Sequence, residues 1–134
     1  MVLPHATEML QLELPCTRAA ASTVREAMAR LDALGWVLGD AMLVATELVN
    51  NAVTHSGCEE EHVVQVAIHR EGDGIVISVR DPGWSSRAVA ALSESVEVGG
   101  GLGLMIVAAL ARRWGADRDE GYHVWAELAT AQAV

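Results

Sequence analysis

The chain contains no lysine, because all nine of its basic residues are arginines, and they are set against eighteen aspartates and glutamates. Without lysine the sequence cannot form a Walker-A phosphate loop, a protein-kinase-type strand lysine or a lysine Schiff base. The formal net charge of −9 disfavours binding to nucleic-acid phosphates or anionic lipid. We therefore expect no direct nucleic-acid or membrane partner, and any nucleotide must be held by a lysine-free site.

Cysteine and long apolar runs are also scarce. Cys16 and Cys58 are the only cysteines, which argues against a disulfide framework and favours a reducing, cytoplasmic location. The longest run without charge or strong polarity, residues 99–111, is far shorter than the ~20 apolar residues of a membrane-spanning helix. The N-terminus lacks the basic start and apolar core of a signal peptide. We expect one domain covering residues 1–134.

Hydrophobic periodicity predicts a mixture of strands and helices. Two-residue alternation predicts strands over residues 9–14, 63–69, 75–79 and 122–128. Helical spacing predicts helices over residues 17–34, 40–55 and 102–114. A Gly-rich turn at residues 71–74 should join the two middle strands as an antiparallel hairpin. The order predicts an α+β fold with one layer of sheet and helices on one face.

A polar stripe marks the second predicted helix. Glu47, Asn51 and His55 lie four residues apart on an otherwise apolar segment, so they share one face. Burying such groups is costly unless something pairs with them, and Mg²⁺, which seeks oxygen ligands and phosphates, is a good candidate. A stripe that faces solvent would give the same pattern.

Two further segments are candidates for ligand binding. Asp81-Pro82-Gly83 follows a predicted strand, where the carboxylate of Asp81 could accept a hydrogen bond from an exocyclic amino group, although the tripeptide is also an ordinary turn. Residues 99–104, Gly-Gly-Gly-Leu-Gly-Leu, precede the third predicted helix. Glycine amides and a helix N-terminus can bind an anion such as phosphate, although a flexible glycine hinge would give the same sequence pattern.

Together the three segments resemble the Bergerat (GHKL) ATP-binding family of gyrase, MutL and histidine kinases. Residues 47–51 resemble its N-box, residues 81–83 its first glycine box and residues 101–104 its second, with a lid at about residues 84–100 between the glycine boxes. The strings ATELVNNAVTH, VRDPG and GLGLMIVAALARRWG resemble the stand-alone anti-sigma-factor serine kinases. The resemblance implies a two-layer α/β sandwich with a mainly antiparallel mixed sheet.

The resemblance also implies roles for single residues. Glu47 would activate the attacking hydroxyl or water, and Asn51 would bind the Mg²⁺ that bridges the phosphates of ATP. Asp81 would recognise the adenine amino group, and Gly83 would give the base room. The remaining nucleotide-binding positions are those of the second glycine box and the single basic residue of the lid, namely Gly101, Leu102, Gly103, Leu104 and Arg87.

The implied function is that of a cytoplasmic ATP-binding regulator. Such a protein binds a sigma factor, phosphorylates a serine or threonine of an anti-sigma-factor antagonist, and is commonly a homodimer. Two departures favour an alternative, a catalytically inactive binding module that responds to nucleotide: Tyr122-His123 stands where relatives carry a threonine, and the lid sets Arg87 against Glu94 and Glu97. A self-contained histidine kinase is excluded because residues 17–34 contain no histidine, while an α/β domain that binds no nucleotide stays open.

Overall fold

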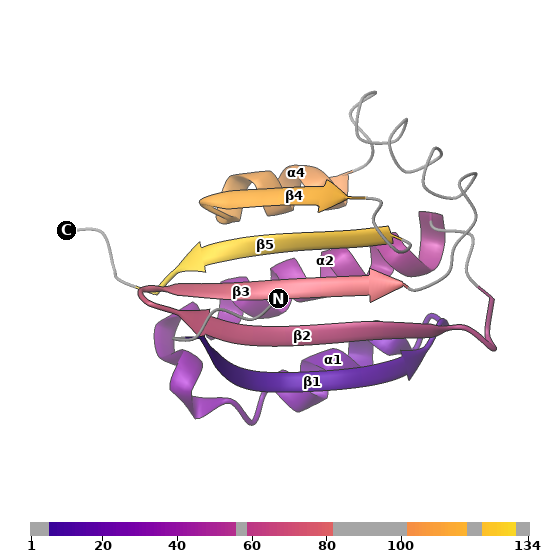
Figure 1. Cartoon of the computed structure of the whole chain (residues 1–134), viewed down its shortest axis with the longest axis horizontal. Coiled ribbons are helices and arrows are strands. Elements are labelled where there is room, and N and C mark those ends of the chain that lie inside the picture. Colours follow the sequence, from indigo (N-terminus) through magenta and orange to yellow (C-terminus); the bar gives the residue numbers. More distant parts are fainter. Residues whose placement is uncertain (1–5, 56–58, 82–101, 118–121, 131–134) are drawn as a thin grey trace.

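The computed structural model describes residues 6–55, 59–81, 102–117 and 122–130. Its five strands form one sheet of order β1-β2-β3-β5-β4, and the helices lie together on one face of that sheet (Figure 1). The strands are β1 (Thr7–Pro15), β2 (Val63–Glu71), β3 (Gly74–Asp81), β4 (Arg113–Asp117) and β5 (Tyr122–Ala129). Every pairing between described strands is antiparallel. The predicted α+β sandwich is confirmed.

The core lies between the sheet and the helix α2 (Leu38–His55). Alternate residues of the central strands are fully buried, as at Ile75, Ile77 and Val79 of β3, because successive side chains of a strand project to opposite faces. On α2, Val44 and Leu48 are equally buried. This helix contacts α1 (Ala20–Met28), α4 (Leu102–Leu110) and strands of the sheet, so it is the central helix that its apolar sequence predicted.

The hairpin between β2 and β3 forms where the sequence predicts it. Glu71 pairs with Gly74, and Gly72 between them has φ of +58°, a left-handed conformation that glycine adopts without steric cost. The first helix is shorter than predicted. It ends at Met28 instead of residue 34, because Arg30 and Leu31 donate to carbonyls three residues back, which tightens and ends the helix. A 3₁₀ helix, Asp32–Val37, follows and bends at Gly35, whose φ is +53°.

The last predicted helix was wrong only in its final four residues, 111–114. α4 ends at Leu110, and the edge strand β4 begins at Arg113. The side chains of Arg112 and Arg113 both bond to Glu127 of β5, which holds the segment against the sheet. Gly115 lies opposite Trp125, and a Cβ there would be 3.0 Å from the indole Cζ2. The strand therefore depends on contacts with β5.

The cysteine prediction also needs correction. Cys16 is 6% exposed and disulfide-bonded, whereas the low cysteine count argued against disulfides. The other cysteine of the chain, Cys58, lies outside the described residues. Among the helices that the structure describes, none has the length and apolar character needed to cross a membrane.

Candidate functional site

The sheet register brings the ends of three elements to one end of the domain. β3 ends at Asp81, and Gln65 near the start of β2 pairs with Arg80, so β2 begins where β3 ends. α2 ends at His55, shortly before β2, and therefore reaches the same end. Figure 1 shows the last turn of α2 beside the arrowhead of β3. The end of α2 and Asp81 at the end of β3 therefore lie at the same end of the domain.

The start of α4 lies at this end as well. After α4, Arg113 of β4 pairs with Glu127, and Glu127 pairs with Val76 near the start of β3. The helix therefore runs from the end of β3 back toward its beginning, and Figure 1 shows this direction. The first amides of a helix have no partner within it, and together with the helix dipole they favour an anion. The first turn of α4 is thus placed as a phosphate-binding segment would be.

Asp81 is the buried acidic group of the site. Its side chain is 0% exposed, and it continues the buried, helix-facing series of Ile77 and Val79 along β3. A carboxylate is expensive to bury unless polar groups meet it, so its place at the end of a strand is typical of a binding residue and not of a surface turn.

The N-box residues lie on the face of α2 near this end. Asn51 is 8% exposed, whereas its neighbour Asn50 is exposed and Glu47 is half-buried. The alternative of a stripe facing bulk solvent therefore does not hold for Asn51. The described residues include no group of three or more histidine, cysteine or acidic side chains that could hold a metal. Mg²⁺ in a nucleotide site takes most of its ligands from phosphates and water, so one carboxamide such as Asn51 fits that donor set.

The second glycine box is described only in part. Leu102 and Gly103 form the start of α4, and Leu104 in its first turn is 7% exposed. Gly83, Arg87, Gly101 and the lid at about residues 84–100 lie outside the described residues.

The structure corrects the interpretation of His123. In the ladder, Asp81 pairs with Tyr122 and His123 pairs with Arg80. Neighbouring residues of a strand face opposite sides, so His123 projects to the face away from Asp81. There it lies 2.8 Å from Ser78 and 3.1 Å from Asp117. His123 therefore does not lie beside Asp81, and Tyr122 is the residue across from Asp81.

Comparison with known proteins agrees with this arrangement. A family model described as the histidine kinase-like ATPase domain matches residues 10–128. Among solved structures, the crystal structure of the RsbU and RsbW domains of Rv1364c from Mycobacterium tuberculosis superposes with a TM-score of 0.59 at 22% identity. That match covers 90% of this chain but 32% of the other, and it shows a common fold. No curated protein matches the sequence. Because the family model spans most of its length, the chain belongs to the histidine kinase-like ATPase domain family.

Proposed function

We propose that this protein is a Mg²⁺- and ATP-binding regulator that acts as an anti-sigma factor and phosphorylates a serine or threonine of an antagonist protein. The observation that carries the proposal is the meeting of buried Asp81, buried Asn51 and the first turn of α4 at one end of the sheet. Each corresponds to a nucleotide-binding motif of the family. Its natural partners are a sigma factor and the antagonist.

The chemistry follows from the residue types. The carboxylate of Asp81 accepts from the adenine amino group, and the amides at the start of α4 receive the phosphates. Mg²⁺ held by Asn51, when bound, neutralises phosphate charge. Glu47, one turn before Asn51 on the same face of α2, orients the attacking hydroxyl and accepts its proton. Metal and backbone dipoles thereby take the place of lysine.

Nucleotide binding is tested by calorimetry with Mg-ATP on the wild type and Asp81→Asn. Replacing the carboxylate by an amide keeps its shape but removes the acceptor from one position, so the affinity should fall at least about tenfold. Asp40→Asn, at an exposed acidic residue in the first turn of α2, is the matched control and should bind as the wild type does. Equal affinity in all three proteins would refute the adenine role of Asp81.

Phosphotransfer is tested by incubating the protein with labelled ATP and candidate antagonists. Glu47→Gln should retain ATP binding and lose phosphoserine or phosphothreonine formation by about 100-fold or more. Tight ATP binding and nucleotide-dependent partner affinity without any transfer would instead support the binding-module alternative, which the single basic residue of the lid favours.

We also propose that the regulator forms a homodimer through β1. This strand is at one edge of the sheet, where its outer backbone groups can pair with a second strand. Light scattering after size exclusion should report twice the 14.2 kDa mass of one chain, and a monomer at assay concentrations would contradict the proposal.

A further inference from the structure

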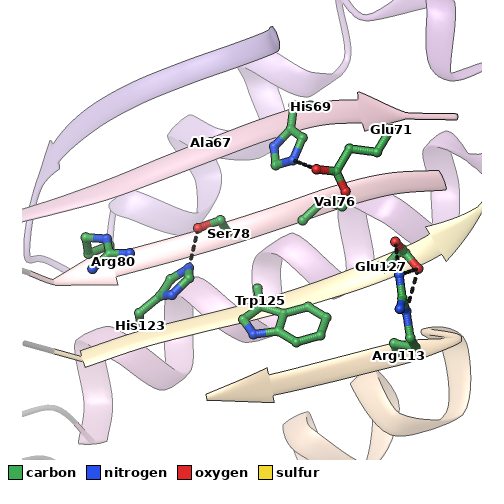
Figure 2. A pocket seen from close by; sticks show the side chains of 10 residues that line it. All are labelled: Ala67, His69, Glu71, Val76, Ser78, Arg80, Arg113, His123, Trp125 and Glu127. Carbon is green, nitrogen blue, oxygen red and sulfur yellow. Dashed lines mark hydrogen bonds and ion pairs between the residues drawn. The ribbon is translucent and has the colours of Figure 1, made fainter. Parts of the chain in front are cut away.

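The face of the sheet that points away from the helices carries its own group of polar side chains. Ser78 of β3, His123 of β5 and Asp117 of β4 come from three adjacent strands. The Oγ atom of Ser78 lies 2.8 Å from Nε2 of His123, and Nδ1 of the same ring lies 3.1 Å from Oδ2 of Asp117. Figure 2 shows the first of these contacts, with Ser78 and His123 turned toward each other across the strands. One imidazole therefore bridges a hydroxyl and a carboxylate.

The hydrogen bonds fix which ring nitrogen carries the proton. An ionised carboxylate can only accept, so Nδ1 of His123 must donate to Asp117. In the neutral ring Nε2 is then the acceptor, and the hydroxyl of Ser78 must donate to it. This is the order of nucleophile, base and orienting acid that activates a serine in hydrolytic enzymes of unrelated folds.

The group opens into a pocket that can hold a substrate. A cavity of about 400 Å³ covers this face and includes Ser78, Arg80, His123 and Trp125 in its lining. Trp125 pairs with Ser78 in the sheet, and its indole extends toward β4, where it lies over Gly115 and forms an apolar part of the lining (Figure 2). Arg80 follows Ser78 by two residues on the same face of β3 and pairs with His123, which puts positive charge near the hydroxyl.

We propose that this pocket is a second site, a serine-dependent acyl-transfer centre that takes small carboxylic esters with an apolar leaving group. Ser78 Oγ attacks the ester carbonyl carbon while its proton passes to Nε2 of His123. The ester C–O bond breaks, the leaving alkoxide takes that proton, and the acyl group remains on Ser78. Water, deprotonated by His123, then releases the carboxylic acid and restores the hydroxyl.

Asp117 acts through the imidazole and is a positioning residue. The backbone amides of the central strands already donate within the sheet ladder. Arg80, and not a pair of backbone amides, therefore stabilises the negative charge on the tetrahedral oxygen. A single guanidinium is a weaker oxyanion site than two fixed amides, so both acylation and deacylation should be slow. An activated ester with a good leaving group should still acylate Ser78 faster than the acyl-enzyme is hydrolysed.

The test uses p-nitrophenyl acetate without ATP, so it does not depend on the proposed nucleotide function. Wild type should release nitrophenolate in a burst, and tryptic mass spectrometry should find one acetyl group on the peptide containing Ser78. Ser78→Ala should lower the protein-dependent rate about 100-fold. Ser22→Ala, at an exposed serine of α1 whose hydroxyl donates to the carbonyl of Ala19, should keep the wild-type rate. Acetyl found elsewhere, or full activity in Ser78→Ala, would overturn the proposal.

Asp117→Asn separates positioning from simple cross-strand stabilisation. If the Ser78–His123–Asp117 contacts have only a structural role, Asp117→Asn should lower the melting temperature and leave the pH dependence of acylation unchanged. A positioning role predicts a fall of at least tenfold and a displaced pH–rate profile, because asparagine no longer fixes the proton on Nδ1. The charged or titratable groups that line the cavity with His123 or bond to it are Asp117, Arg80, His69, Glu71, Arg113 and Glu127, and Glu13 and Glu8 of β1 lie farther along the same face. An unchanged profile in Asp117→Asn, or a wild-type rate equal to that of buffer, would refute the centre.

Discussion

Glu127→Gln tests how the edge strand β4 is held to the sheet. The carboxylate of Glu127 is 4% exposed, and it accepts from Arg112 Nε at 3.0 Å and from Arg113 Nε and Nη2 at 2.9 and 2.8 Å. The glutamine keeps the shape but loses the charge and turns an N–H group toward guanidinium donors. Breaking a buried pair on one side costs about 3–5 kcal/mol. Because Arg113 is 70% exposed and can regain water, we expect a loss of about 2–3 kcal/mol.

That loss would be a large share of the stability of a domain this size, which is on the order of 5–15 kcal/mol. By interpolation, each kcal/mol should shift the melting temperature by about 3–5 °C, so Glu127→Gln should melt about 10 °C below the wild type at pH 7. Asp73→Asn is the control, since Asp73 bonds Arg112 but is 66% exposed, and its effect should be much smaller.

The pH dependence provides a second check. The hydrogen bond from Arg113, followed by that from Arg112, holds the pKa of Glu127 below its usual value despite burial. A carboxylate whose pKa is lowered by folding contributes its full stability above the unfolded value of about 4.3, and loses it as the pH falls through the folded value. The difference in melting temperature between the wild type and Glu127→Gln should therefore become smaller below about pH 4. Equal melting temperatures at pH 7, or a difference that does not change on acidification, would refute the reasoning.

Three other predictions concern the core, the sheet edge and the metal. Leu48→Ala removes a fully buried side chain of α2 and should lower the free energy of unfolding by about 2–5 kcal/mol in urea titration. Gly115→Val should displace the ring of Trp125 and change the near-ultraviolet circular dichroism, whereas Gly39→Ala, where nothing lies within 4 Å of the added carbon, should leave it unchanged. Asn51→Ala should abolish the gain in ATP affinity that Mg²⁺ gives the wild type in calorimetry, and an unchanged Mg²⁺ dependence would contradict its role as ligand.

Features governed by local chemistry could be predicted from the sequence. The hairpin at residues 71–74 needs only its glycines, and the apolar character of α2 is enough to identify a central helix. The position of Asp81 at the end of a strand also followed from alternation, although its complete burial did not.

Features governed by contacts distant in the sequence were missed. Residues 113–117 form a strand because Glu127 and Trp125 lie beside them, and no pattern within the segment distinguishes it from the last turn of a helix. Without β4 the partners of His123 could not be identified, since Asp117 and Ser78 become its neighbours only through the registers of three strands. The early end of α1 at Met28 likewise depends on backbone bonds that composition does not reveal.

Because successive side chains of β3 project to opposite faces, two neighbouring residues, Arg80 and Asp81, lie in different environments. Asp81 faces the buried layer between the sheet and the helices, while Arg80 lines the cavity on the opposite face of the sheet. Inserting a single amino acid directly after Ser78 would exchange the two environments, placing a guanidinium among aliphatic side chains and a carboxylate on the open face. A substitution on one face therefore leaves the side-chain directions on the other face unchanged, whereas a change in the length of this strand alters both.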